Sequence, residues 1–396
     1  MKRVGIYQKD LGKTGWPDRW VNSIAQILSE DAEVEIVHHN PELDPKEYGE
    51  ILGVDFSRIL FRSVPVPEWP DHADLQSRRT LKQESNFCRE YSEPYDLFLV
   101  LSSEPPFFSH AKRNILLTPF PKSTFEEYYG HDQPEWEQKG IFSRWWLKKY
   151  HYLEWRGRFA SYQTILCPSQ FSREWCWNRW QLMSQVLYPL PRPDFIPAEE
   201  KEALIVSVGN FSAKNENRQD LLINAFQEFY DRMIVRFDLD ENWRLCLMGN
   251  CSGSPEDLAF VEKLRRKAYG YPIEFQTNVD FQTLKNTMSQ ATFFWSANGY
   301  ALNENDVPDS VESFVMTTLE AQISGAIPMI FHTGSAAEVI HHGMNGFLWS
   351  TFRELVDMTT AILIEKKILP FLEAGAIKNA ENFNQAAFRE NVKKFI

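Results

Sequence analysis

The strongest constraint on the fold is an alternation of short apolar runs with helical stretches, which occurs in two series. Such runs are typical of parallel strands that are joined by crossover helices. The first series predicts strands at 3–8, 34–39, 97–102, 114–120 and 164–169. The second predicts strands at 204–209, 244–249, 273–277, 291–297 and 327–331, with helices at 217–232, 255–269, 281–290 and 315–324. Two doubly wound α/β domains therefore follow.

A proline-rich segment separates the two series. The sequence YPLPRPDFIPAEEKEA at 188–203 holds four prolines before a charged run, so it cannot form a regular helix. We predict a first domain over 1–190, a linker over 191–203 and a second domain over 204–376. The polar tail at 377–396 is predicted to be a helix that crosses back to the first domain. Two facing domains would leave a deep cleft, with ligands at the carboxyl ends of the strands.

Charge and cysteine content narrow the class of protein. The formal net charge of -12 argues against general attraction to nucleic acid, which depends on clustered Lys and Arg. The N-terminal sequence lacks the apolar core of a secretory signal, and no run is long and apolar enough to span a membrane. The five cysteines are scattered and form no CxxC pair, which favours free thiols in the cytoplasm.

One ordered string of motifs lies in the second series. Glu312 and Glu320 stand in an E-x7-E spacing, followed by SGAIP (324–328), HTGSAAEVI (332–340) and HHGMNGFLW (341–349). LIVSVGN and LMGN close two earlier strands. Together these features resemble the retaining glycosyltransferases of the GT-B fold, family 4, also described as glycosyl transferases group 1. The resemblance covers most of 164–396. It implies two facing Rossmann-like domains that move a sugar from a nucleotide-sugar donor to a glycan or lipid-linked acceptor.

The resemblance implies donor-binding roles around the two glutamates. Glu320 is expected to accept the ribose hydroxyls, and Glu312 to contact the donor sugar as a catalytic residue. A helix that begins near Phe314 would direct its free N–H groups and positive dipole end at the diphosphate. The alternative for either glutamate is a surface position on an amphipathic helix.

The segment VGNFSAKNENRQDLLINAF at 208–226 supplies the expected cations. Gly209 would let backbone or diphosphate approach closely. The family usually has Arg at the next position, where this chain has Asn210. Lys214 and Arg218 remain as candidate catalytic cations for the leaving diphosphate. The alternative is that both are solvated loop charges.

Three further positions depart from the family pattern. Ser313 and Val315 stand where relatives commonly have a small glycine-containing motif, and a valine adds bulk beside the sugar. In the first domain Thr118 stands where relatives have a histidine. Retaining transfer in this fold is usually described as attack on the same face, in which the leaving diphosphate accepts the proton. A protein base is then dispensable.

Two loops complete the expected binding residues. Backbone groups around Val279 are expected to contact the donor base. The glycines of DLGKTGWPDRW at 10–20, Gly12 and Gly15, resemble the loop that closes over the donor phosphate and faces the acceptor. An ordinary turn explains the same pattern equally well.

No metal or other cofactor is expected, because the nucleotide sugar is a substrate. The DLD at 238–240 precedes a strand in a polar loop, so we interpret it as a solvated turn and not as a metal site. His341 and His342 are adjacent, so their side chains should diverge.

The segment IFSRWWLKKYHYLEWRGRF at 141–159 interleaves basic and aromatic residues. A helix of this kind can make peripheral contact with an anionic membrane. We favour the alternative, a helix that buries its aromatic face in the first domain.

Two other functions remain open. The substitutions at Asn210, Ser313 and Val315 would suit a glycosyltransferase-like binding or scaffold protein that has lost transfer. A sugar-nucleotide epimerase of the same fold would need acid and base residues in the first domain.

Overall fold

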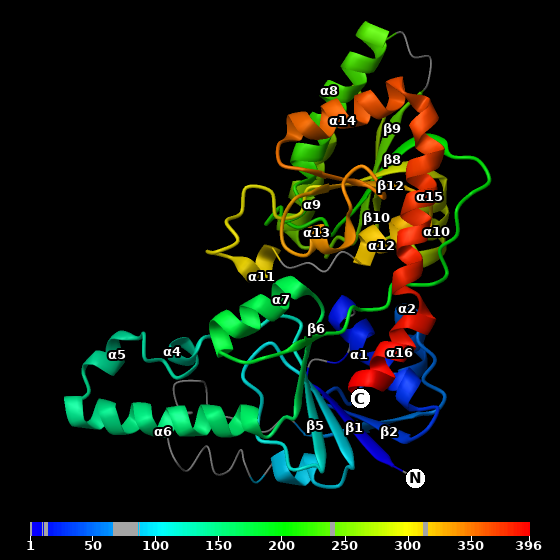
Figure 1. Ribbon diagram of the computed structural model, residues 1–396. Coiled ribbons are helices and arrows are strands. Elements are labelled where there is room, and N and C mark those ends of the chain that lie inside the picture. Colours follow the sequence, from blue (N-terminus) through cyan, green and yellow to red (C-terminus); the bar gives the residue numbers. More distant parts are fainter. Residues whose placement is uncertain are drawn as a thin grey trace. The chain divides into compact units, whose positions relative to one another are not determined.

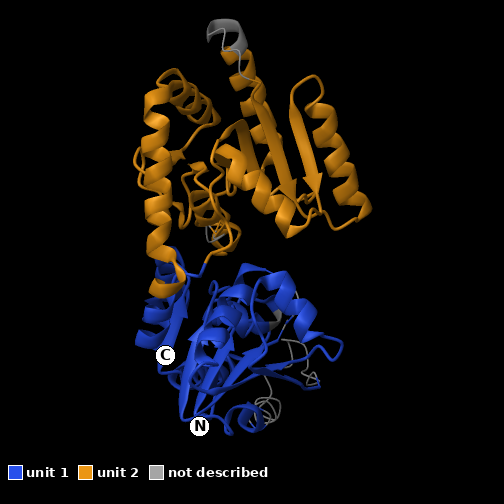
Figure 2. Ribbon diagram, turned by 90° about the vertical axis from the view of Figure 1, so that its right-hand side faces the viewer, with its two compact units in different colours: residues 1–190, 388–396 blue, residues 191–387 orange. Residues whose placement is uncertain are grey.

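The structure is a computed structural model that describes residues 2–9, 11, 15–65, 86, 88–237, 242–311 and 316–396. It has two compact units, residues 1–190 with 388–396, and residues 191–387, which Figure 2 shows in blue and orange. Each unit is a parallel sheet flanked by helices (Figure 1). The predicted class, two Rossmann-like α/β domains, is confirmed.

The first unit is built on a 7-stranded parallel sheet with the order β3-β2-β1-β4-β5-β6-β7. Its strands are β1 (Arg3–Gln8), β2 (Glu33–His38), β3 (Ile59–Ser63), β4 (Leu97–Leu101), β5 (Arg113–Leu117), β6 (Thr164–Cys167) and β7 (Gln185–Val186). Its helices are α1 (Trp16–Leu28), α2 (Pro45–Leu52), α4 (Phe125–Tyr128), α5 (Pro134–Glu137), α6 (Ile141–Ala160), α7 (Gln170–Trp175), a π-helix (Cys176–Trp180) and α16 (Gln385–Phe395).

Alternate residues of each central strand serve the two faces of this sheet. On one face Leu99 joins a core with α1, α2 and α16, and on the other Val100 joins a core with Trp155 and Phe159 of α6. Because both faces are covered, the strands need apolar residues at every position, which explains their continuous runs.

Only half of the long helix α6 is packed in this way. Its buried residues, His151, Glu154, Trp155, Arg158 and Phe159, all lie in the carboxyl-terminal half. The favoured interpretation of 141–159 as a packed aromatic helix is therefore right for Trp155 and Phe159. It is wrong for Phe142, Trp145, Trp146 and Tyr152, which are exposed.

A pair of histidines, His151 of α6 and His131, should make the first unit sensitive to acid. Nε2 of His131 lies 2.9 Å from Nδ1 of His151, and their other ring nitrogens have no hydrogen-bond partner within the described part of the chain. Burial, followed by positive neighbours that include Lys139, lowers the pKa of His151 to about 4. Burial likewise lowers the pKa of His131 to about 4.

In the unfolded chain both histidines have the ordinary pKa of about 6.5. As the pH falls, the unfolded chain therefore binds these protons at a higher pH than the folded chain does. We expect stability to fall as the pH decreases from about 6.5 to about 4, by ~3 kcal/mol for His151 alone. Thermal melts across this range should show the slope in the wild type and a shallower one in His151→Gln. His341→Gln, which changes an exposed histidine of the second unit, should keep the wild-type slope. Equal slopes for His151→Gln and the wild type would contradict the expectation.

The second unit is built on a 6-stranded parallel sheet with the order β10-β9-β8-β11-β12-β13. Its strands are β8 (Glu202–Val208), β9 (Arg244–Gly249), β10 (Ile273–Thr277), β11 (Ala291–Ser296), β12 (Ile327–Phe331) and β13 (Phe347–Trp349). Its α-helices are α8 (Gln219–Phe237), α9 (Pro255–Lys267), α10 (Phe281–Gln290), α11 (Pro308–Val311), α12 (Met316–Ile323), α13 (Ala336–Val339), α14 (Phe352–Ile364) and α15 (Leu369–Ala380). Short 3-10 turns lie at Lys366–Ile368 and Glu381–Phe383.

Several predicted boundaries change. The sequence did not predict β3, β7 or β13, which are edge or near-edge strands with short or half-exposed sequences. The strand predicted at 114–120 ends at Leu117, because Pro119 has no N–H to donate. Strand β8 begins at Glu202, inside the predicted linker.

The carboxyl-terminal tail is not one helix. Helix α15 belongs to the second unit, and the chain returns to the first unit at Phe388, later than the predicted 377. Asn384 starts the last helix, because its Oδ1 accepts a hydrogen bond from the N–H of Ala387 at 2.9 Å. Arg113 of β5 then donates to the carbonyl oxygen of Phe395 at 2.9 Å.

Candidate functional site

The carboxyl edge of the second unit's sheet contains a switch in strand order. From β8 the chain adds β9 and β10 on one side, and it then adds β11, β12 and β13 on the other. Ligands of open α/β sheets bind in the crevice where the order reverses. The loops that follow β8 and β11 therefore frame the candidate site.

The loop after β8 is a turn that requires close approach of two backbones. A Cβ on Gly249 would lie 2.0 Å from the carbonyl oxygen of Gly209, and one on Gly209 would lie 2.6 Å from Cγ of Asn217. Nε2 of Gln219 donates to the carbonyl oxygens of Gly209 and Asn210 at 3.2 and 3.1 Å. The turn is thereby held in one shape, and the side chain of Asn210 is exposed beside it.

The two candidate cations differ in their surroundings. Lys214 is exposed, and its side chain forms no hydrogen bond or ion pair with the residues that the structure describes. Arg218 donates through Nε to Asp220 at 3.2 Å and through Nη1 to the carbonyl oxygen of Tyr300 at 3.0 Å. Burial opposes ionisation of Asp220, yet hydrogen bonds from Asn215 and Arg218 lower its pKa, so the carboxylate stays charged. Lys214 can therefore reach a ligand, whereas Arg218 joins the loops after β8 and β11.

Glu320 is a buried residue of α12 with 7% of its surface exposed. The interpretation of this residue as a surface glutamate is therefore wrong. Its Oε1 accepts a hydrogen bond from the backbone N–H of Arg192 at 3.2 Å.

The loops after β9 and β10 are joined by Asn278. This residue has a positive φ of 54°, and its amide bonds both ways to the backbone of Cys251, at 2.8 and 3.1 Å. Val279 follows it and is half-buried. The expected base-contacting backbone therefore belongs to a loop that is already ordered.

A further link between loops at this edge is made by Glu304, which the sequence did not predict. Oε1 of Glu304, in the loop after β11, accepts hydrogen bonds from Thr333 Oγ1 at 2.8 Å and from Gly334 N at 2.9 Å. The loops after β11 and β12 are thus joined through one carboxylate. No local motif marks Glu304, because its partners lie 29 and 30 residues away in sequence.

Several predicted site residues lie outside the described residues: Gly12, Glu312, Ser313, Phe314 and Val315. The DLD at 238–240, interpreted as a solvated turn, lies outside them as well. Gly15 is described and is the N-cap of α1, with φ −127°. Among the described residues, a Cβ there would lie 3.4 Å from Pro17, which is an ordinary van der Waals contact.

The carboxyl edge of the first unit's sheet offers a buried hydroxyl and a polar pair. Thr118 is buried after β5, and its Oγ1 has no hydrogen-bond partner within the described ranges. The carbonyl of Val64 can only accept, so Nδ1 of His39 donates to it at 3.0 Å, and Nε2 accepts from the Tyr7 hydroxyl at 2.8 Å. Sequence analysis did not single out Tyr7 or His39, because they come from different strands.

Among the residues with described positions, no three His, Cys, Asp or Glu side chains gather as metal ligands. Nδ1 of His342 accepts from the N–H of Leu348 at 3.2 Å. No helix in the described ranges combines the length and apolar character that crossing a membrane requires.

The family model described as glycosyl transferases group 1 matches residues 193–388. This match spans almost all of the second unit. Among curated proteins, the human GDP-Man:Man(3)GlcNAc(2)-PP-Dol alpha-1,2-mannosyltransferase is 27% identical over 184 residues, covering 42% of this chain and 33% of the relative. The protein of the same description from Xenopus laevis is 32% identical over 95 residues, covering 24% of this chain and 19% of the relative. The match thus spans a third or less of these relatives.

Solved structures are similar over the whole chain. HepE of Anabaena, solved with UDP and glucose, has a TM-score of 0.65 at 12% identity, covering 100% of this chain and 99% of that one. Sucrose-phosphate synthase from Thermosynechococcus elongatus has a TM-score of 0.64 at 13% identity, covering 100% and 98%. At such identities the similarity establishes the fold alone. The chain therefore has the GT-B fold, and its second unit matches the model of the glycosyl transferases group 1 family.

Proposed function

We propose that this chain is a glycosyltransferase that binds a nucleotide-sugar donor at the strand-order switch of its second unit. The observation that carries the proposal is the close-approach turn at Gly209, with the exposed cation of Lys214 in the same loop, in a unit that the family model matches. A diphosphate needs backbone that can come close and positive charge that is free to move onto it.

Buried polar groups supply the remaining donor contacts in this proposal. Glu320 accepts the ribose hydroxyls in addition to the N–H of Arg192, because a buried carboxylate forms strong charge-assisted hydrogen bonds. The backbone around Val279 contacts the base. Glu312, by family resemblance, contacts the donor sugar.

The proposed reaction is transfer with retention. The bond between the anomeric carbon and the donor phosphate oxygen breaks, and the acceptor hydroxyl oxygen bonds to that carbon on the same face. The acceptor proton passes to the leaving phosphate. Lys214 stabilises the negative charge on this phosphate, which is where charge develops. Arg218 positions the loops, and no metal or protein base takes part.

The proposed acceptor is a glycan or a lipid-linked glycan. The names of the two curated relatives describe a dolichol-linked oligosaccharide acceptor for those proteins, which supports the lipid-linked form. The proposed compartment is the cytoplasm, which suits the free thiols found at every cysteine.

Donor binding is tested by thermal shift in EDTA with UDP-, GDP-, ADP- and dTDP-sugars. A ligand at about 100 times its dissociation constant should stabilise the fold by ~2.7 kcal/mol. We expect one nucleotide class to shift the wild type, and Glu320→Gln to lose most of that shift when each is compared with its own unliganded melt. The glutamine keeps the side-chain volume of this buried position.

The main alternative is a binding or scaffold protein that has lost transfer, as the substitutions at Asn210, Ser313 and Val315 would allow. An active transferase should hydrolyse its donor slowly when no acceptor is present, whereas this alternative predicts no hydrolysis at all. A thermal shift with no hydrolysis and no transfer would favour this alternative.

A sugar-nucleotide epimerase of the same fold would need an acid and a base in the first unit. The Tyr7–His39 pair is a candidate for these two roles.

A further inference from the structure

Helix α6 carries an apolar stripe that faces solvent. Phe142, Trp145, Trp146, Tyr152 and Leu153 are 75%, 56%, 51%, 49% and 61% exposed. With Lys149 and Arg156 these residues recur at spacings of three and four, so they share one face of the helix over four turns. We call these seven residues the α6 stripe.

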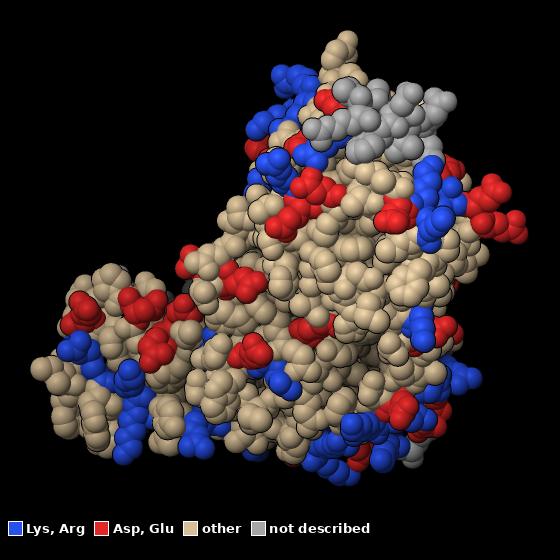
Figure 3. Space-filling view, turned by 45° about the horizontal axis from the view of Figure 1, so that its top comes forward, with Lys and Arg blue, Asp and Glu red and all other residues tan. Residues whose placement is uncertain are grey.

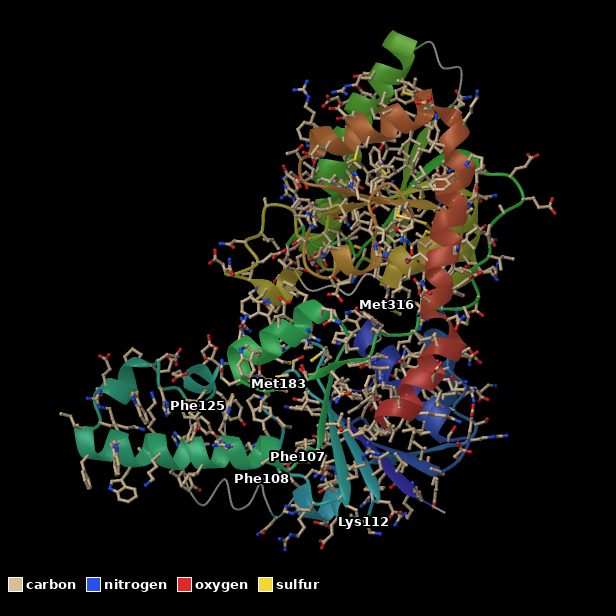
Figure 4. All side chains as sticks on the ribbon, viewed as in Figure 1. Phe107, Phe108, Lys112, Phe125, Met183 and Met316 are labelled. Atoms are coloured by element: carbon tan, nitrogen blue, oxygen red, sulfur yellow. The ribbon has the colours of Figure 1, made fainter. Side chains whose placement is uncertain are left out.

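Residues outside the α6 stripe anchor the helix, and within the stripe Tyr152 also contacts the Phe125 ring, with the centroids 6.2 Å apart. The opposite face is anchored by Trp155 and Phe159 in the core, and by Glu154, which accepts hydrogen bonds from Arg158 and the Tyr129 hydroxyl. Phe125 of α4, labelled in Figure 4, also packs on this helix. Its ring centroid lies 5.6 Å from that of Trp155. A helix so anchored would normally expose polar residues on its other face.

The exposed charges of α6 are all positive. Its one acidic residue, Glu154, is buried and already bound to Arg158. Lys149 lies 5.5 and 5.7 Å from the ring centroids of Trp145 and Trp146, and Arg156 lies 5.9 Å from that of Tyr152. This local excess stands out in a chain with a net charge of -12.

We call the segment from α4 to α6, residues 125–160, the arm of the first unit. Acidic side chains lie on the side of this arm that is opposite the α6 stripe. Glu126 and Glu127 of α4, Asp132, and Glu137 of α5 are exposed. In Figure 3, blue side chains alternate with tan ones along the lower edge of the arm at the left, and the red ones lie above them. The arm therefore has one basic, apolar side and one acidic side, which would fix its orientation on a charged surface.

We propose that the α6 stripe docks on the surface of a membrane that contains anionic lipids, with the helix lying in the plane of the headgroups. Indole and phenol rings favour that interfacial depth, and cations at the same level meet the anionic headgroups. The alternation of rings and cations matches such a layered surface, in which apolar chains lie beneath anionic headgroups. This inference goes beyond donor transfer and does not depend on it.

The test is sedimentation of the full-length protein with vesicles. We expect binding to vesicles that mix phosphatidylcholine with phosphatidylserine, and weaker binding to phosphatidylcholine alone. The double variant Trp145→Ala/Trp146→Ala should lower the partition coefficient about tenfold or more. Lys149→Glu/Arg156→Glu should lower it about tenfold or more on the anionic vesicles, with a loss that high salt reproduces in the wild type.

Matched controls are available on the same unit. Trp177→Ala removes a tryptophan that is 50% exposed, compared with 51% for Trp146, but that lies outside the stripe. Lys46→Glu reverses an exposed charge on α2. Both controls should partition as the wild type does, and all variants should keep the donor-induced thermal shift, so that failure of docking is distinguished from failure of donor binding.

Two results would overturn the proposal. One is equal partitioning of the stripe variants and the wild type, or no binding of the wild type to either vesicle. The other is a wild-type dimer in light scattering that Trp145→Ala/Trp146→Ala converts to a monomer without any vesicle binding, which would make the stripe an interface between copies.

Discussion

Lys214→Ala should lower kcat/KM for sugar transfer by about 10²–10³-fold while leaving the fold intact. The lysine is exposed and uncommitted within the described structure, so its removal should change the free energy of unfolding by no more than about 0.5 kcal/mol. Its proposed task is to stabilise charge on the leaving diphosphate, and loss of one such group typically costs about 10²–10³-fold in rate. Steady-state kinetics with the donor class found by thermal shift, paired with a melt of the variant, measure both quantities.

Lys263→Ala is the matched control, because Lys263 is an exposed lysine of α9 in the same unit. It should transfer sugar at the wild-type rate. Arg218→Ala should behave differently from Lys214→Ala, since it removes the bonds to Asp220 and to the Tyr300 carbonyl and should lower the melting temperature as well as the rate. Transfer by Lys214→Ala at the rate of Lys263→Ala would remove Lys214 from the proposed mechanism.

Gly249→Ala should destabilise the second unit by about 3 kcal/mol or more. The added Cβ would lie 2.0 Å from the carbonyl oxygen of Gly209 and 2.6 Å from its carbonyl carbon. Both atoms belong to backbone, which cannot rotate away as a side chain could. The turn after β8 would have to move, so donor binding should be lost together with stability. Thermal melts with and without donor measure the two effects.

Gly253→Ala separates this clash from the cost of a positive φ. Gly253 has φ +80°, but a Cβ there would meet no atom of the described residues within 4 Å. An L-residue in this conformation costs roughly 1–2 kcal/mol. The melting temperature of Gly253→Ala should therefore lie between those of the wild type and Gly249→Ala. Similar melting temperatures for the two variants would show that the clash of a Cβ at Gly249 adds little to the loss of stability.

The central strands were predictable because local sequence decides them. The predicted ranges 3–8, 244–249 and 327–331 are the observed bounds of β1, β9 and β12. The range 273–277 also matches β10, although this strand lies at the edge of the second sheet. A parallel strand covered on both faces needs apolar residues throughout, which leaves a continuous run that is visible in one dimension. The edge strands β3, β7 and β13 lack this signal because fewer neighbours cover them.

The sequence predicted which residue types make up the candidate site. The separate roles of these residues became clear only from their surroundings in the structure. Lys214 and Arg218 are both cations in one short segment, and nothing in the segment separates them. Asp220 and the Tyr300 carbonyl hold Arg218 and leave Lys214 exposed. Glu320 is buried by elements distant in sequence, as its bond to Arg192 shows.

The sequence by itself determined the two α/β units, the order of their central elements and the chemical groups at the carboxyl edge of the second sheet. The tertiary structure decided which of equivalent side chains are buried, bonded or free. Trp155 is buried in a core, whereas Trp145, of the same helix, faces solvent. The physical reason is that apolar runs act through neighbours along the chain, whereas burial and hydrogen bonding depend on partners that folding brings from elsewhere.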